Sequence, residues 1–123
     1  MNEGRFSVAG RLSSFRHAAR GVAVMVKTQH NARIHLAATL LVVALGWWLR
    51  IGAADWRWLV LAIALVWAAE AMNTAFEYLC NVVSPDFSPM VRNAKDIGAG
   101  AVLICSVGAA VLGVLVFLPY LQR

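Results

Sequence analysis

Charged side chains are scarce in this chain of 123 residues: Asp, Glu, Lys and Arg make up 14% of it, and only six residues are acidic. Hydrophobic residues make up 61%, and the mean hydropathy is +0.69. A soluble domain carries more charge, since about 25% of the residues in an average globular protein are charged. The composition therefore excludes an ordinary soluble domain and indicates a small integral membrane protein.

Cysteine is scarce too. Cys80 and Cys105 lie in stretches predicted to form membrane helices, without a Cys-x-x-Cys spacing or a neighbouring histidine, so we interpret them as packing residues. No base-reading motif accompanies the net charge of +5, and nucleic acid is not an expected partner. Much of the basic charge lies in the first 33 residues, on Arg5, Arg11, Arg16, Arg20, Lys27 and Arg33. In a membrane protein such a basic start indicates contact with an anionic leaflet.

Hydrophobic periodicity predicts an all-α membrane protein in which residues 1–123 form a single domain. Apolar residues recur at helical spacing between residues 7 and 28, with basic residues on another face, which is typical of a helix lying on the bilayer surface. Three apolar stretches, 33–54, 56–83 and 92–119, are long enough to cross a hydrocarbon core of about 30 Å.

Polar residues and prolines mark the expected ends of these helices. A polar break at residues 28–31 precedes the first span, and Asp55 is expected to cap the second. The stretch 84–89 contains two prolines and predicts a loop, and Pro119 is expected to end the third span. The asymmetry of Lys and Arg places the N-terminus and the second loop in the cytoplasm, as in a multi-pass protein of the bacterial inner membrane.

The most informative stretch closes the second span. Because a helix turns about 100° per residue, Glu70, Asn73, Thr74, Glu77 and Asn81 fall in one stripe. Each carboxylate at membrane depth costs at least roughly 2.5–3.5 kcal/mol, so a partner or ligand must offset that cost. The stripe is therefore expected to mark a functional site.

The spacing of the stripe is suited to phosphoryl transfer. Glu70 lies about 10 Å deeper than Glu77 and is suited to act as a general base. Glu77, nearer to water, is suited to bind Mg²⁺ shared with substrate phosphates. On the next helix, Lys95 supplies a cation for phosphate and Asp96 a hydrogen-bond acceptor for a nucleoside. The phosphate acceptor would be an alcohol in the bilayer.

Two other interpretations use the same residues. The stripe could be an interhelical polar cluster in which Glu70, Asn73 and Glu77 pair with Lys95 or Arg33. Alternatively, Glu70 could be the exchange site of a small proton-coupled transporter. The cytoplasmic Lys95 and Asp96, together with the second carboxylate, count against the transporter.

Four motifs resemble those of the prokaryotic diacylglycerol kinase family, which includes bacterial diacylglycerol kinases and undecaprenol kinases. They are EAMNTAFE at residues 70–77, AKDIGAGAVL at 94–103, FRHAARG at 15–21 and NARIHL at 31–36. The resemblance extends from about residue 11 to residue 119. It implies a homotrimer with sites between subunits and a lipid kinase that uses ATP and Mg²⁺. Diacylglycerol, converted to phosphatidic acid, is the first acceptor implied, and undecaprenol is the alternative.

The resemblance also implies a role for individual residues. Glu70 is the general base, Asn73 supports it at the lipid, and Glu77 binds the metal. The nucleotide site is implied to comprise Arg11, His17, Glu77, Asp86, Phe87, Ser88, Lys95 and Asp96, with Lys95 on the γ-phosphate. Arg33 and Ala99, which fall within the family motifs, are assigned with Glu70 and Asn73 to the lipid site.

The chain departs from the family pattern at two positions. Gln29 stands where well-known members have a second metal-binding glutamate, so it is expected to offer Mg²⁺ a carbonyl oxygen without a charge. Asn81 stands where many members have an aspartate. His35, at the edge of the first span, is interpreted as an interfacial hydrogen-bonding residue and not as a catalytic acid.

Overall fold

A computed structural model describes residues 4–123, so residues 1–3 of the predicted domain lie outside the described part. The described residues form four helices and no strand: α1 (Val8–Thr28), α2 (His30–Leu49), α3 (Ala53–Val83) and α4 (Pro89–Leu121). Helices α2, α3 and α4 are each long and apolar enough to cross a membrane. The predicted class, one N-terminal helix followed by three spans, is confirmed.

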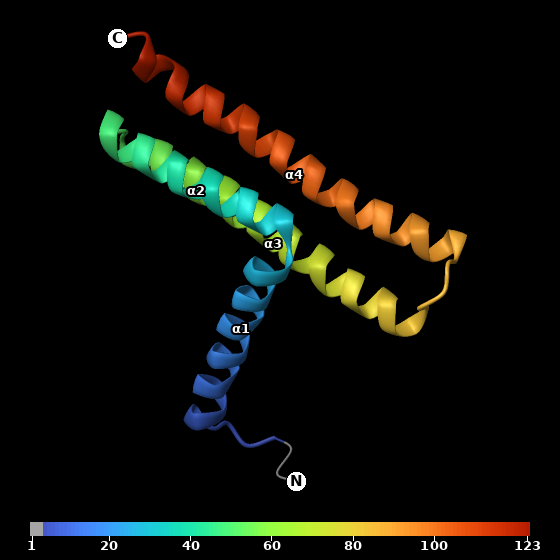
Figure 1. Ribbon diagram of the computed structural model, residues 1–123. Coiled ribbons are helices and arrows are strands. Elements are labelled where there is room, and N and C mark those ends of the chain that lie inside the picture. The colour runs from blue at the N-terminus through green and yellow to red at the C-terminus, as the bar shows by residue number, and fades with distance from the viewer. Residues whose placement is uncertain (1–3) are drawn as a thin grey trace.

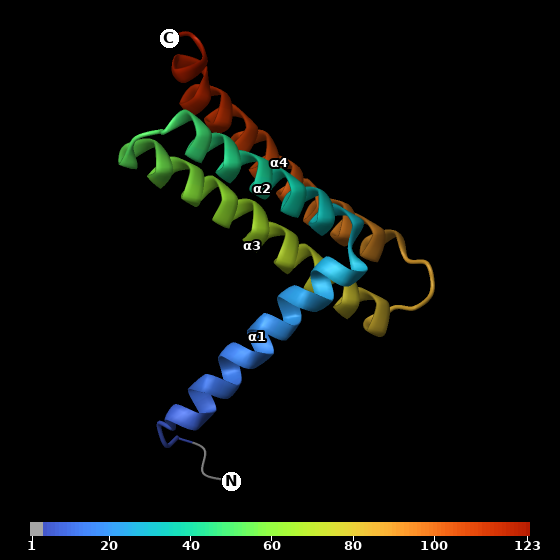
Figure 2. The ribbon, with the colours of Figure 1, turned by 60° about the vertical axis from the view of Figure 1, so that its left-hand side comes forward.

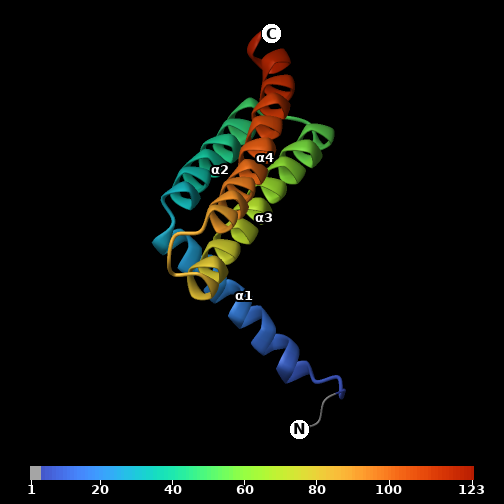
Figure 3. The ribbon, with the colours of Figure 1, turned by 90° about the vertical axis from the view of Figure 1, so that its right-hand side faces the viewer.

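Helices α2, α3 and α4 lie side by side, and α3 runs antiparallel to the other two (Figures 1 and 3). Helix α1 leaves this bundle at an angle, at the end where the α3–α4 loop lies (Figure 2). Met25, near its C-terminal end, is its only buried residue. The rest of α1 is free to lie on a surface, as expected of an interfacial helix.

The unequal lengths of the three spans create an overhang. At 1.5 Å per residue, the 20 residues of α2 extend about 30 Å, whereas the 31 of α3 and 33 of α4 extend about 46 and 50 Å. The α2–α3 turn lies beside the end of α4, where the Arg123 guanidinium donates to the Leu49 carbonyl at 2.9 Å. The excess length of α3 and α4 therefore projects beyond α2 at the other end, which carries the α3–α4 loop.

The predicted bounds of the first span, 33–54, are wrong at both ends. Gln29 alone is extended (φ −107°, ψ 120°), so α2 begins at His30 and the break is a single residue. At the other end Arg50 is left-handed (φ 53°, ψ 52°), which stops α2 at Leu49. The next residue, Ile51, is only 7% exposed and anchors the turn in the core.

Three other expected helix ends also differ. Gly52, not Asp55, caps α3; Asp55 lies in the first turn and accepts a hydrogen bond from the Tyr120 hydroxyl at 2.5 Å. Helix α4 begins at Pro89, whose fixed φ suits the first helical position, three residues before the predicted start. Pro119 does not end α4, because the loss of one backbone donor in the last turn still allows the helix to reach Leu121.

The buried core gathers at the end of the bundle that holds the α2–α3 turn. Ile51, Leu59, Val116 and Phe117 form its buried cluster. Gly46 of α2 is buried beneath the Trp56 indole, and a Cβ there would lie 2.7 Å from the ring. Many of the other large apolar side chains are exposed, as expected of surfaces that face lipid or further subunits.

The contact at Gly46 generates a stability prediction. Gly46→Ala forces a methyl group against a packed indole, and overpacking of this kind costs about 1–3 kcal/mol. Thermal unfolding in detergent should therefore occur at a lower temperature. Gly108→Ala on α4 is the control, because a Cβ there meets no atom within 4 Å. Equal unfolding temperatures for the two variants would contradict this packing.

Candidate active site

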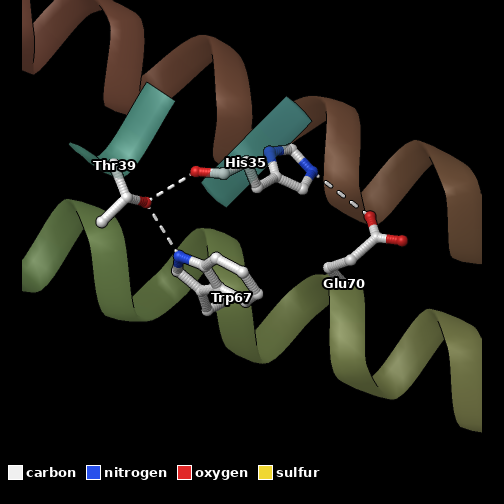
Figure 4. A network of polar contacts seen from close by, with 4 residues as sticks. All are labelled: His35, Thr39, Trp67 and Glu70. Atoms are coloured by element: carbon white, nitrogen blue, oxygen red, sulfur yellow. Dashed lines mark hydrogen bonds and ion pairs between the residues drawn. The ribbon is translucent and has the colours of Figure 1, made fainter. Parts of the chain in front are cut away.

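The carboxylate of Glu70 lies in the interior between α3 and α2. Glu70 is 1% exposed, and its Oε2 lies 3.3 Å from Nε2 of His35 on α2 (Figure 4). The cost of burying this carboxylate is thus offset by a histidine. The interpretation that Glu70 pairs with Lys95 or Arg33 is wrong, since both of those side chains bind elsewhere.

His35 belongs to a chain of polar contacts between α2 and α3. The Thr39 hydroxyl donates to the His35 carbonyl at 2.7 Å, and the Trp67 indole N–H donates to the Thr39 oxygen at 2.9 Å (Figure 4). The Trp67 and His35 rings also meet edge to face, with centroids 6.5 Å apart. Sequence reasoning missed this role of His35. The available signal was the recurrence of His35 and Thr39 four residues apart, on one face of an apolar span.

Asn73 and Thr74, one turn after Glu70, are 8% and 5% exposed. Their side-chain oxygens find no hydrogen-bond partner among residues 4–123. Leaving a buried polar atom unpaired costs about 1–3 kcal/mol, so these two oxygens are suited to meet a ligand. Gly98 of α4 makes room for Asn73, because a Cβ there would lie 2.6 Å from the amide oxygen.

A cavity of about 510 Å³ lies between α1 and the same stretch of α3. His17 and Arg20 of α1 line one side of it, and Thr74 and Tyr78 of α3 line the other. His17 Nε2 also lies 3.3 Å from the Ser13 hydroxyl within α1. The structure therefore brings His17 toward the Glu70 end of the stripe and not into the α3–α4 loop.

The predicted nucleotide residues of the α3–α4 loop do come together. A second cavity, of about 270 Å³, is lined by Asn81, Ser84, Pro85, Asp86, Phe87, Ser88, Val91, Arg92, Lys95 and Asp96. Lys95 Nζ donates to Asn81 Oδ1 at 2.6 Å. Arg92 Nε lies 4.0 Å from Asp96 Oδ2, and both side chains are about 70% exposed, so their attraction is weak in water.

Glu77 and Gln29 are the sequence neighbours of Tyr78 and Thr28, whose hydroxyl groups are in contact. The Tyr78 hydroxyl and the Gln29 amide each lie 3.4 Å from the Thr28 hydroxyl oxygen, as donors to it. Glu77 is half-buried. Across residues 4–123 no group of three or more His, Cys, Asp and Glu side chains is arranged to hold a metal ion. A complete metal cage made by one chain is thus absent from the described residues.

Three predicted site residues lie outside both cavities. The Arg11 guanidinium lies over the Phe6 ring, 5.7 Å from its centroid, in the first turn of α1. Arg33 Nε donates to the Val26 carbonyl at 3.1 Å and thereby caps α1. Ala99 is exposed on α4. Their assigned roles in binding ATP or lipid stay predictions.

The two ends of the stripe are well separated within one chain. Lys95 is held at Asn81, eleven residues from Glu70, which corresponds to about 16 Å along α3. Reacting atoms must approach to about 3–3.5 Å. Glu70 and a phosphate bound at the resting position of Lys95 in the same chain therefore do not meet directly.

Known proteins share these sequence features. The family described as prokaryotic diacylglycerol kinase matches residues 16–117. An undecaprenol kinase of Bacillus subtilis is 33% identical over 108 residues, which cover 88% of this chain and 88% of that protein. A diacylglycerol kinase of Synechocystis is 35% identical over 109 residues, 88% of this chain and 62% of that protein.

A diacylglycerol kinase of Escherichia coli is 31% identical over 74 residues, which cover 60% of this chain and 61% of that protein. The match to the family covers α2 and α3 in full, and most of α1 and of α4. The predicted resemblance is confirmed, and the transporter interpretation loses its support. This chain belongs to the prokaryotic diacylglycerol kinase family and is a membrane-embedded lipid kinase.

Proposed function

We propose that the chain transfers the γ-phosphate of ATP to the hydroxyl group of a membrane lipid alcohol, with Glu70 as the general base. The observation that carries this proposal is the buried Glu70 carboxylate beside the unpaired oxygens of Asn73 and Thr74. Unpaired polar atoms next to a base, at membrane depth, are suited to receive a hydroxyl group that arrives from the bilayer.

On the acceptor side, Glu70 takes the proton of the lipid hydroxyl as the hydroxyl oxygen attacks the γ-phosphorus. The bond from that phosphorus to the β–γ bridging oxygen breaks, and ADP leaves. The Asn73 amide N–H₂ donates a hydrogen bond to the oxygen of the lipid hydroxyl group and so holds it beside the base. The apolar surroundings exclude water, which would otherwise compete as the acceptor. Positioning and electrostatics supply most of the rate enhancement in this reaction class.

On the nucleotide side, Lys95 contacts the γ-phosphate, and Asp96 binds the nucleoside beneath the 84–88 loop. Lys95 is held by Asn81, a neutral acceptor, and therefore keeps its full positive charge for the phosphates. Arg92 adds a second cation to the same cavity. The asparagine in place of the family's aspartate thus favours a triphosphate by removing a negative charge.

Glu77 and Gln29 would hold Mg²⁺. Both side chains offer oxygen ligands. The hydroxyl oxygens of their sequence neighbours, Tyr78 and Thr28, lie 3.4 Å apart, which supports a position of Glu77 and Gln29 near each other. Mg²⁺ usually keeps several water and phosphate ligands, so two protein donors are enough. When bound, the ion would neutralise phosphate charge. Two donors with a single carboxylate are expected to bind it weakly.

A homotrimer, with sites between subunits, is part of this proposal. The separation of about 16 Å between Glu70 and Asn81 supports it, because a neighbouring subunit can bring its nucleotide site to this Glu70. The many exposed apolar side chains of α3 and α4 supply surface for such contacts. The orientation proposed above, with the loop 84–88 in the cytoplasm, gives that site access to ATP.

Diacylglycerol and undecaprenol are the two candidate acceptors. Relatives named diacylglycerol kinase support the first. The relative named undecaprenol kinase, which matches over 88% of both chains, supports the second. The product would be phosphatidic acid in one case and undecaprenyl phosphate in the other.

The first prediction concerns the base and the acceptor. In mixed micelles with labelled ATP, the protein should phosphorylate at least one of the two lipids, and competition between them identifies the preferred one. Glu70→Gln removes the base and should lower kcat by about 10²–10⁴-fold. Asp55→Asn, the same change at the other end of the bundle, should retain activity. A folded Glu70→Gln protein with normal turnover would contradict the role of Glu70.

The second prediction concerns Asn73. Gly98→Ala places a methyl group 2.6 Å from the Asn73 amide oxygen and displaces it from the acceptor. A displacement of about 1 Å can cost roughly 100-fold in rate, so lipid phosphorylation should fall strongly. Gly100→Ala, two residues away, meets no atom within 4 Å and should behave as the wild type. Equal kcat/KM values for the lipid in the two variants would argue against Asn73.

The third prediction concerns the metal. Glu77→Ala should raise the Mg²⁺ concentration needed for half-maximal activity, because it removes the one carboxylate of the pair. Gln29→Glu adds a charged oxygen ligand and should lower that concentration. Mg²⁺ titrations at saturating ATP and lipid measure both shifts. Identical titration curves for wild type and Glu77→Ala would remove Glu77 from the metal site.

A further inference from the structure

His35 is the residue closest to the proposed chemistry that the proposed function leaves without a task. It lies on α2, 35 residues before Glu70 in sequence, and its side chain is 15% exposed. Its Nε2 is 3.3 Å from Glu70 Oε2, and the other carboxylate oxygen is directed away from the ring (Figure 4). One oxygen of the base is therefore engaged, and the other is available to a substrate.

The imidazole is itself held in place. Trp67 binds the Thr39 hydroxyl, Thr39 binds the His35 carbonyl, and the Trp67 ring packs edge-on against the His35 ring. These contacts join the α2 backbone at His35 to α3 one turn before Glu70. A base is aimed best by a partner whose own position is held by packing and hydrogen bonds.

We propose that His35 is a positioning residue for Glu70: it donates its Nε2–H to Oε2 and so aims Oε1 at the lipid hydroxyl. This inference rests on the proposed function, in which Glu70 is the general base. A glutamate has three rotatable side-chain bonds, and one fixed hydrogen bond removes most of that freedom. Nε2 must carry a proton to donate this hydrogen bond.

An imidazole suits this task because its Nε2–H is fixed on a planar ring and donates in one direction. Lysine or arginine at the same place would offer several donors on a longer and more flexible side chain. The structure keeps the nearby cations apart from Glu70, because Arg33 caps α1 and Lys95 binds Asn81.

The kinetic test compares two substitutions at one position. His35→Leu removes the donor and should lower kcat for lipid phosphorylation by about 10–100-fold. The KM for ATP should stay unchanged, because the α3–α4 loop cavity does not include α2. His35→Gln places an amide N–H₂ near the position of Nε2 and should recover most of the lost kcat. His30→Leu, the same change at an exposed histidine of α2, should have no effect.

A double substitution separates positioning from packing. If His35 acts through Glu70, then His35→Leu should cost nothing further in a Glu70→Gln background. Losses that multiply in the double variant would overturn the proposal. So would a His35→Gln protein as slow as His35→Leu, because the donor would then not be what matters.

An independent readout needs no turnover. In protein labelled with ¹⁵N-histidine, the His35 ring should show the Nε2-protonated tautomer, assigned by its loss in His35→Gln. Glu70→Gln should shift that signal and leave those of His17 and His30 in place. A His35 ring insensitive to Glu70→Gln overturns the proposal.

These experiments distinguish failure of the inference from failure of the proposed function. If the wild type transfers phosphate and Glu70→Gln does not, while His35→Leu keeps a normal kcat, only the role of His35 is wrong. If the folded wild type phosphorylates neither lipid, the proposed function and the inference that rests on it are both overturned.

Discussion

A carboxylate buried between apolar helices is costly unless a polar partner lies at the same depth, and the packing of this molecule depends on that constraint. Glu70 is 1% exposed, and the side chain that meets it comes from α2. Helix α2 must therefore lie against α3 at that level, with His35 turned inward. The polar contacts through Thr39 and Trp67 fix the same rotation of α2. The contact between Glu70 and His35 thus specifies how α2 is rotated against α3, two helices that are otherwise largely apolar.

The lengths of the helices then separate the proposed lipid site from the proposed nucleotide site. Helix α2 is just long enough to cross the hydrocarbon core, whereas α3 and α4 extend past it. Glu70 lies where α2 still covers α3, which suits an acceptor drawn from the bilayer. Lys95 and the 84–88 loop lie on the overhang, where a charged nucleotide stays in water. Base and cation are consequently distant within one chain, and this distance is the physical argument for sites shared between subunits.

The proposed site is costly for the isolated chain. Asn73 and Thr74 each bury an oxygen that has no partner among the described residues, and Gly98 leaves space instead of filling it. Stability is supplied at the opposite end, where Ile51, Leu59 and Phe117 pack together and Tyr120 joins α4 to the start of α3. Such separation of a packed end from an unsatisfied end is expected when function requires polar atoms held ready for a ligand.

The sequence by itself determined the all-helical membrane class, the stripe that contains Glu70 and the loop before α4. The class follows from composition, the stripe from a period of 3.6 residues, and the loop from its prolines, and all three are local properties of the chain. Sequence reasoning missed both ends of α2 and the starts of α3 and α4: the left-handed Arg50 and the cap at Gly52 depend on how the turn packs. Nor did it identify the partner of Glu70 or of Lys95. Those pairings depend on how each helix is rotated against its neighbour, and many rotations bury apolar faces equally well. Only the tertiary structure decided that α2 turns His35 toward Glu70 and that Asn81 holds Lys95.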